Sequence, residues 1–337
     1  MKYIVCKEPF EFLLDQKPIP ERKPGESLLK IKRIGICGTD IHAFGGTQPY
    51  FNYPRILGHE LAAEYIEGEA EGFMPGDKVT FIPYFHCGTC VACRNGLTNC
   101  CVNMQVFGVH IDGGMAEYVC VADTYLLHGD GLDYDHIALV EPLAIAAHGV
   151  RRAGVTKKDT VLVMGAGPIG LGLIQFSHLA GAKVIVMDIN DNRLNFCKDE
   201  LNVEALINPS KDDVLQSLIN ITDGDMPTVV IDATGNRNVM NSAFNYMAHG
   251  GRYVLVGLQK GELAFSHPDF HKRESTLMSS RNATREDFNY VLQSLRSGSI
   301  DPGKYITHRG TFDTMIGDFT GWIDPKNNAI KIIIDVD

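Results

Sequence analysis

The spacing of apolar positions changes near residue 157 and divides the chain into two parts. In the first part, short strand-like runs alternate with turns rich in glycine, proline and asparagine; the clearest runs are 27–34, 78–83 and 115–122. Runs of this kind, bounded by such turn residues, are typical of β structure. Helix signals are few there. We therefore expect an irregular, β-rich first domain.

Beyond Lys157, continuous apolar runs alternate with segments of helix length. The runs are 160–164, 184–188, 204–207, 229–235, 253–257 and 276–280, and the helical segments are 168–182, 191–201, 214–219 and 240–247. Continuously apolar strands are buried on both faces, as in a parallel sheet covered by helices. The alternation predicts the α/β class, with a doubly wound parallel sheet.

The last part of the chain predicts a helix around 286–295 and a mixed tail that ends in KIIIDV. This segment is too short to bury a core of its own, so we expect it to return to the first domain. The expected boundaries are 1–146 for the first domain, 147–283 for the second and 284–337 for the returning segment.

Composition and charge narrow the possible partners. The 337 residues include 31 Lys and Arg against 41 Asp and Glu, a net charge of −10. This is the wrong sign for a protein that binds a phosphate backbone or an anionic membrane. No apolar stretch approaches the roughly 18 residues that a membrane span needs, and the N-terminal residues do not resemble a signal peptide. We expect a cytoplasmic protein with neither nucleic acid nor membrane as its partner.

Five of the nine cysteines are crowded into one short segment. Four of them have the spacing Cys87-x2-Cys90-x2-Cys93-x7-Cys101, which without a signal peptide indicates metal ligation rather than disulfides. Four thiolates leave no open position on the metal, so the spacing predicts a structural zinc site. An iron–sulfur cluster and unligated thiols are the alternatives, and Cys100 could replace Cys101.

A second set of ligand types follows the run 27–34. Cys37 and His59, about 20 residues apart, could bind a catalytic zinc, which keeps one position open and needs about three protein ligands. The third ligand is a carboxylate, either Glu60 or Glu141, and the spacing excludes neither. Glu141 lies in an apolar segment, where a carboxylate is costly unless it is paired or coordinated. A buried thiol and a capping histidine would be the plain alternative for the first pair.

Two polar residues after Cys37 suit a proton relay. Thr39 and His42 lie two and five positions beyond it. A hydroxyl and an imidazole could there carry a proton away from a metal-bound alcohol.

A nucleotide-binding turn follows the run 160–164. Its sequence matches G-x-G-x-x-G and reads Gly165-Ala166-Gly167-Pro168-Ile169-Gly170. It lies between a strand and a helix and is followed by Asp188 at the end of the next strand, which is the context of a dinucleotide site. An α/β domain with an empty turn is the alternative.

Each part of this turn has an expected role. Gly165 permits the tight turn, Gly167 lets the backbone approach the pyrophosphate, and Gly170 lets helix and strand pack closely. Asp188 would accept hydrogen bonds from the adenosine ribose and repel a 2′-phosphate, which favours NAD over NADP. Arg193 is expected to stack on the adenine or to lie in solvent.

Together and in this order, these motifs resemble the zinc-dependent medium-chain alcohol dehydrogenase family over nearly the whole chain. The resemblance implies a GroES-like catalytic domain followed by a Rossmann domain, and it favours Cys101 as the fourth structural ligand. It implies Cys37, His59 and either Glu60 or Glu141 as catalytic zinc ligands. One departure is Ala63, where the family usually has glycine three residues after the Gly-His-Glu motif.

Within the family, the two glutamates resemble the polyol and sugar-acid branch. Segment 279–288 resembles bacterial enzymes that oxidise aldonates such as L-galactonate, L-gulonate or L-idonate at C5. The expectation is therefore an enzyme with one catalytic and one structural Zn²⁺, which oxidises a secondary alcohol of a polyol or sugar acid to a ketone with NAD. In this reading Thr39 and His42 relay the proton, and Arg281 or another base pairs with a substrate carboxylate. A structural or cofactor-contacting role is the alternative for Arg281.

Other functions remain open at this point. The enzyme alternatives are a threonine or a 2,3-butanediol dehydrogenase. The non-enzymatic alternative is a zinc-stabilised binding protein that senses NAD. A homodimer or homotetramer is expected, because the strand at 276–280 would otherwise leave an uncovered sheet edge.

Overall fold

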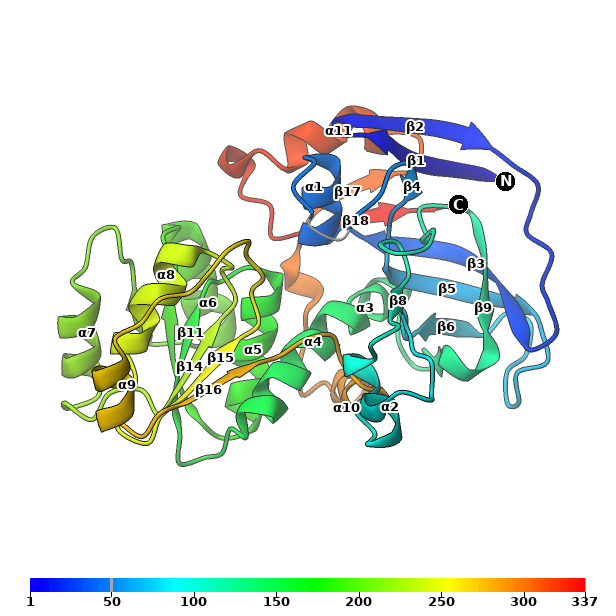
Figure 1. Cartoon of the computed structure of the whole chain (residues 1–337). Helices are drawn as coiled ribbons and strands as arrows, with labels where there is room; N and C mark the ends of the chain where they lie inside the picture. The colour runs from blue at the N-terminus through cyan, green and yellow to red at the C-terminus, as the bar shows by residue number, and fades with distance from the viewer. Residues whose placement is uncertain (49–50, 337) are drawn as a thin grey trace. The chain divides into compact units, whose positions relative to one another are not determined.

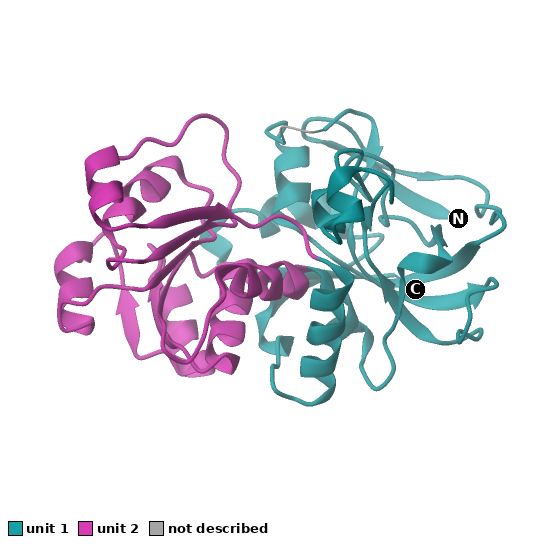
Figure 2. Ribbon diagram, turned by 60° about the horizontal axis from the view of Figure 1, so that its bottom comes forward, with its two compact units in different colours: residues 1–141, 284–337 teal, residues 142–283 magenta. Residues whose placement is uncertain are grey.

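A computed structural model describes residues 1–48 and 51–336. The chain forms two compact units, one made of residues 1–141 with 284–337 and the other of residues 142–283 (Figure 2). Helix α4 (Val140–Ala153) carries the chain from the first unit into the second. No helix in the described ranges has the length and apolar character needed to cross a bilayer.

The first unit is built mainly from β strands (Figure 1). Its main sheet has the order β10-β6-β5-β3-β18-β17, with β9 also paired to β3. These strands are β3 (Glu26–Gly35), β5 (Glu60–Glu67), β6 (Lys78–Phe81), β9 (Tyr118–Ala122), β10 (Leu126–His128), β17 (Ile306–Thr311) and β18 (Lys331–Asp335). The tail strand β18 is antiparallel to β3, which brings the end of the chain beside its beginning.

Two smaller sheets and several short helices complete this unit. One sheet has the order β2-β1-β4 and the other pairs β7 with β8. Their bounds are β1 (Lys2–Glu8), β2 (Glu11–Gln16), β4 (Arg55–Ile56), β7 (Tyr84–Phe85) and β8 (Gln105–Val106). The helices are α1 (Gly38–Phe44), α2 (Val91–Arg94), α3 (Tyr134–Ala138), α10 (Arg285–Arg296) and α11 (Met315–Trp322).

An aromatic cluster ties α1 and α11 to β2 in the core of this unit. Phe12 stacks on Phe44 at a centroid distance of 4.9 Å, and Phe319 meets Phe12 edge-on at 5.0 Å. All three rings are buried. Burial of rings in these geometries stabilises the contact beyond the area that they remove from water. The packing fixes α1, which carries candidate site residues, against the body of the unit.

The second unit contains the parallel sheet that the apolar pattern predicted, and this confirms the α/β fold. The order is β13-β12-β11-β14-β15-β16, and every pair is parallel. Numbered from β11, this is the 3-2-1-4-5-6 order of doubly wound dinucleotide-binding sheets. The strands are β11 (Thr160–Met164), β12 (Lys183–Met187), β13 (Ala205–Ile207), β14 (Val229–Asp232), β15 (Arg252–Leu255) and β16 (Thr276–Ser279).

The helices of this unit follow the predicted segments with two differences: the helix expected at 240–247 is placed differently, and a helix at 267–272 was not predicted. Their bounds are α5 (Pro168–Leu179), α6 (Asp191–Leu201), α7 (Val214–Ile221), α8 (Arg237–Ser242) and α9 (His267–Lys272). The segment 240–247 was predicted as one helix. In the structure α8 ends at Ser242 and a 3₁₀ turn follows over Ala243–Asn245. Asn236 caps α8 by accepting from the backbone N–H groups of Asn238 and Val239, which places the start of the helix earlier.

Candidate metal and nucleotide sites

Three of the predicted catalytic metal ligands lie together in the first unit. Cys37 is the N-cap residue of α1, His59 directly precedes β5, and Glu60 is the first residue of that strand. One donor atom from each lies within 4.8 Å of the other two. His59 is buried, and its Nδ1 has no hydrogen-bond partner among the described residues. A thiolate, an imidazole and a carboxylate in this arrangement can hold a zinc ion with a position left open.

Asp40 connects the two loops that carry these ligands. Its carboxylate accepts hydrogen bonds from the backbone N–H of Cys37 at 2.9 Å and from that of Gly58 at 3.3 Å. The side chain is fully buried, and this burial raises the pKa of Asp40. Since Gly58 precedes His59, one carboxylate sets the spacing of the thiol and the imidazole.

Glu60 is held in place by two features that the sequence analysis did not identify. Lys331 of β18 forms an ion pair with its Oε2 and also donates to the backbone oxygen of Ile36 at 3.1 Å. A Cβ atom on Gly35 would come within 2.3 Å of the same Oε2, so glycine leaves the space that the carboxylate fills. Burial alone would lower the pKa of Lys331, but Glu60 and Cys37 outweigh burial and raise it.

The second predicted carboxylate, Glu141, lies outside the group of three donors. It is buried in the first turn of α4, and its Oε1 accepts a hydrogen bond from the hydroxyl of Tyr84. Burial, with a further contribution from Glu60, raises its pKa to about 7, although His59 and the Tyr84 hydrogen bond act in the opposite direction. The structure therefore pairs this carboxylate, as its apolar surroundings require.

The predicted relay residues lie on α1. Thr39 is half-buried in the first turn of the helix, whereas His42 is exposed in its last turn. The Nδ1 of His42 lies 2.9 Å from the hydroxyl of Thr47. An exposed imidazole at this position can exchange a proton with solvent.

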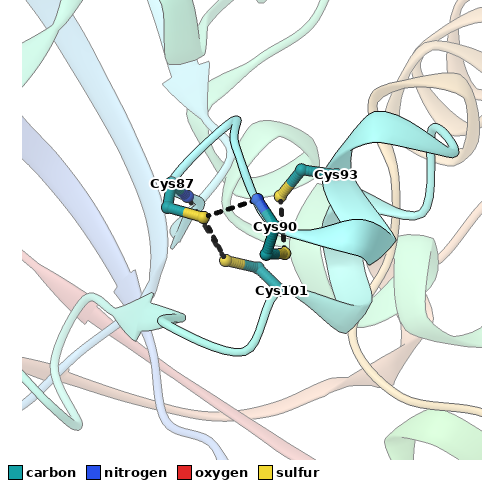
Figure 3. Close-up of side chains that lie close together, drawn as sticks. All are labelled: Cys87, Cys90, Cys93 and Cys101. Carbon is teal, nitrogen blue, oxygen red and sulfur yellow. Dashed lines mark hydrogen bonds between the residues drawn. The ribbon is translucent and has the colours of Figure 1, made fainter.

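The four cysteines of the second predicted metal site also converge (Figure 3). The Sγ atoms of Cys90 and Cys93 are 3.5 Å apart, as are those of Cys87 and Cys101. Hydrogen bonds from Thr89 lower the pKa of Cys87 to about 5, which favours the thiolate that binds metal. The four sulfur atoms lie within 4.8 Å of one another, and a metal bound by all four would have no open position.

The neighbouring Cys100 is exposed and lies outside this group. Strands β7 and β8 flank the segment that carries the four cysteines. They pair Tyr84 with Val106 and Phe85 with Gln105. A metal bound by the four cysteines would therefore help to hold the β7–β8 pair, which carries Tyr84, in place.

In the second unit the glycine turn has the geometry that a dinucleotide needs. Gly165 has a φ of +95°, and a Cβ atom on Gly170 would come within 1.8 Å of the oxygen of Gly165. At Gly167 a Cβ would meet only the Nη1 of Arg193, at 3.8 Å, so the backbone faces open space. Helix α5 begins at the next residue, Pro168, and Ile169 is the second residue of the helix. A helix N-terminus behind an open glycine is suited to a pyrophosphate.

Asp188 is next to this turn, and its Oδ2 accepts from the backbone N–H of Ala166 at 2.7 Å. Its carboxylate thereby links the end of β12 to the glycine turn. Arg193 was expected to stack on the adenine or to lie in solvent. In the structure it is half-buried, and its guanidinium lies beside Gly167. Arg281 is exposed just beyond the carboxyl end of β16.

The sequence analysis missed four residues that position the candidate ligands and Glu141, namely Gly35, Asp40, Tyr84 and Lys331. Of these, only Lys331 could have been suspected from the sequence, because a lysine at the start of the apolar strand KIIID is unusual unless it has a buried partner. The other three have roles that depend on residues brought close by folding.

Fold and sites together define a zinc-dependent dehydrogenase. Residues 23–130 match the family model of the alcohol dehydrogenase GroES-like domain, and residues 168–297 match that of the zinc-binding dehydrogenases. The chain belongs to the zinc-dependent medium-chain alcohol dehydrogenase family. This confirms the family and the enzyme class that the motifs indicated.

Two relatives and one solved structure illustrate the similarity. L-galactonate-5-dehydrogenase of Escherichia coli K12 is 44% identical over 336 residues, which cover 99% of this chain and 98% of the relative. L-idonate 5-dehydrogenase of Vitis vinifera is 32% identical over 315 residues, covering 87% of this chain and 83% of the relative. The short chain alcohol dehydrogenase RspB of Escherichia coli CFT073, solved with its cofactor NADH, is 31% identical with a TM-score of 0.91 and 99% coverage of both chains.

Proposed function

We propose that this chain is an NAD-linked dehydrogenase that oxidises a secondary hydroxyl of a sugar acid, of the L-galactonate, L-gulonate or L-idonate type, to a ketone. The observation that carries the proposal is the group of Cys37, His59 and Glu60, whose donor atoms lie within 4.8 Å of one another. The names of the L-galactonate and L-idonate dehydrogenases support the substrate class.

The reaction would need two bound groups, a zinc ion and NAD. When bound, zinc polarises the substrate hydroxyl and NAD accepts a hydride. Cys37, His59 and Glu60 would hold the catalytic zinc, and the four-cysteine cluster a structural one. The glycine turn and Asp188 would bind NAD, for which the NADH complex of RspB is a precedent. Arg193 lies close enough to Gly167 to contact the pyrophosphate.

The protein's own residues then orient the substrate and move one proton. Thr39 would accept a hydrogen bond from the substrate hydroxyl, and His42 on the same helix would take up the proton that leaves it. His42 is exposed and releases that proton to solvent. Asp40 and Lys331 keep the ligand side chains in place while the charge develops.

Arg281 is proposed to pair with the substrate carboxylate. Its position beyond the carboxyl end of β16 supports this, because ligands of doubly wound sheets bind at that edge. The substitution Arg281→Ala should raise the KM for aldonates and leave the KM for neutral polyols unchanged. An increase in the KM for NAD alone would instead indicate a cofactor contact.

The assembly and cellular setting are part of the proposal. Strand β16 ends the parallel sheet and exposes Leu277 at 38%, which supports a homodimer or homotetramer that covers this edge. The nine free cysteines suit the cytoplasm, where thiols stay reduced.

The test is NADH formation across a panel of L-galactonate, L-gulonate, L-idonate, sorbitol, L-threonine, 2,3-butanediol and ethanol. We expect the highest kcat/KM for one of the aldonates. Cys37→Ser should abolish turnover and remove one of about two zinc ions per chain, while NADH binding persists. Turnover on threonine or butanediol alone would overturn the substrate class, and NAD binding without turnover on any alcohol would support a sensor.

A further inference from the structure

The loop that follows β14 in the second unit touches the glycine turn of the candidate nucleotide site. In this β14 loop (residues 233–236), the backbone N–H of Ala233 donates to the oxygen of Met164, the residue before Gly165, at 2.9 Å. A Cβ atom on Gly165 would lie 3.0 Å from the Cγ2 methyl of Thr234. The turn is therefore bordered by this loop, and a shift of the loop would change the shape of the turn.

The carboxylate of Asp232, the last residue of β14, holds the loop in place. Its Oδ1 accepts hydrogen bonds from the hydroxyl of Thr234 at 2.6 Å and from the backbone N–H of the same residue at 3.2 Å. Its Oδ2 accepts from the backbone N–H of Gly235 at 3.1 Å. The hydroxyl of Thr234 in turn accepts from the backbone N–H of Asn236 at 3.0 Å. One carboxylate thus fixes both the loop and the side chain whose methyl group lies beside the turn.

We propose that Asp232 is a positioning residue for the cofactor, which acts through Thr234 to hold the β14 loop against the glycine turn before NAD binds. The inference rests on the proposed function, because it takes the glycine turn as the NAD site. Its main readout is the affinity for NADH, which does not depend on which alcohol the enzyme oxidises.

The burial of Asp232 supports this role. The side chain is fully buried, and the three hydrogen bonds that it accepts among the described residues all come from the β14 loop. Burial raises the pKa of Asp232, and the hydrogen bonds from the loop act in the opposite direction. A buried carboxylate is costly unless its oxygens are satisfied. The carboxylate and the loop therefore hold each other, because a displaced loop would leave the charge without its donors.

Close packing on the other side of the loop is the second support. A Cβ atom on Gly257, two residues beyond the end of β15, would come within 2.5 Å of Oδ2 of Asp232 and 2.3 Å of the nitrogen of Gly235. Gly235 has a φ of +59°, and a Cβ atom there would lie 2.6 Å from the oxygen of Leu258. The loop is thus confined between this segment and the glycine turn. A binding element that is already held in shape loses less freedom when its ligand binds, which strengthens the affinity.

Strand β14 has a second pair of carboxylate and threonine at its opposite end. Thr228, directly before the strand, donates to Oδ1 of Asp159 at 2.8 Å, and Asp159 is also buried. Ligands of doubly wound sheets bind outside the carboxyl ends of the strands. Only the Asp232 pair lies at that edge, so the Asp159 pair is a matched control for the loss of the same kind of contact.

The experiment measures the Kd for NADH by isothermal titration calorimetry, with the full-length, zinc-loaded enzyme and no alcohol present. The test variants are Asp232→Asn, which replaces one acceptor oxygen by an NH₂ group, and Thr234→Val, which keeps a methyl group and removes the hydroxyl. The control variants are Asp159→Asn and Thr228→Val. Thermal unfolding shows whether each variant is folded at the assay temperature.

We expect Asp232→Asn and Thr234→Val each to raise the Kd for NADH about 10-fold, as for the loss of one hydrogen bond to a charged group. In turnover, the KM for NAD should rise in proportion, whereas kcat at saturating NAD and the KM for the alcohol should stay at their wild-type values, because only binding energy is lost. The control variants should keep the wild-type Kd, although Asp159→Asn lowers the thermal midpoint.

Two outcomes would overturn the proposal. One is an unchanged Kd for NADH in folded Asp232→Asn. The other is an equal rise in the control variants, which would show that any weakening of the sheet has this effect. If Asp232→Asn does not fold, Thr234→Val decides the question, because Thr234 is exposed. NADH binding that follows the expected pattern, without oxidation of any aldonate, would leave the positioning role intact and overturn only the substrate class.

Discussion

Lys331 and Glu60 form an ion pair in the interior of the first unit, with side-chain exposures of 2% and 1%. The two residues are 271 positions apart and meet because β18 and β5 flank β3 in the same sheet. A buried charge left without its partner costs about 3–5 kcal/mol. Zinc, when bound, would be a second positive partner for Glu60.

Lys331→Met should therefore lower the thermal midpoint of the metal-free protein strongly, by an amount equivalent to about 3–5 kcal/mol. The loss should be smaller with zinc, because the metal supplies positive charge beside Glu60. Thermal unfolding of wild type and variant, each with and without zinc, measures this difference. Lys331→Arg serves as the charge-conserving control, and an equal loss in both metal states would contradict the prediction.

The four-cysteine cluster predicts a contrast between two neighbouring cysteines. Cys101→Ser should lose one zinc per chain and at least about 2.7 kcal/mol of stability, the value for a ligand present at 100 times its Kd. Cys100→Ser should lose neither, since Cys100 is exposed and outside the cluster. Metal analysis and thermal unfolding of both variants test this, and zinc loss from the Cys100 variant would reverse the assignment.

Asp188 predicts the cofactor preference. Its carboxylate lies next to the glycine turn and accepts from the backbone N–H of Ala166. A hydrogen bond to a charged group contributes about 1.5–3 kcal/mol, so Asp188→Ala should raise the KM for NAD by about 10- to 100-fold. The KM for NADP should fall, because the repulsion of a 2′-phosphate is removed. Steady-state kinetics with both cofactors measures the two changes; a variant as selective for NAD as the wild type would exclude this role.

Asp159 predicts a pH-dependent contribution to the stability of the second unit. It accepts hydrogen bonds from Thr228 and Thr156 and pairs with Arg252. Burial would raise the pKa of this carboxyl, but these partners outweigh it and lower the pKa below its ordinary value. Asp159→Asn should cost about 1.5–3 kcal/mol near pH 7.

The lowered pKa of Asp159 determines how its contribution to stability changes with pH. The contribution is complete above the unfolded value of about 3.9 and is lost as the pH falls through the lower folded value. The stability gap between wild type and variant should thus be constant near neutrality and shrink in acid. Asp269→Asn is the control, because Asp269 forms an exposed ion pair with Lys272, and exposed pairs contribute little to stability. A gap that grows in acid would refute the assignment.

The sequence by itself determined the features that depend on local spacing. Strand and helix alternation fixed the parallel sheet because each apolar run is short and continuous. Cysteine spacing and the Gly165–Gly170 turn indicated the metal and nucleotide chemistry, since their donors lie close together along the chain. The sequence could not show whether Glu60 or Glu141 belongs with Cys37 and His59, and it could not identify the partner of either glutamate.

Tertiary structure alone decided how each carboxylate is held. Lys331 reaches Glu60 only through the pairing of β18 with β3, and Tyr84 reaches Glu141 across 57 positions. Asp40 similarly spans 18 positions to Gly58. These contacts depend on strand register and on which faces pack together, and neither is encoded in the spacing of residues along one segment.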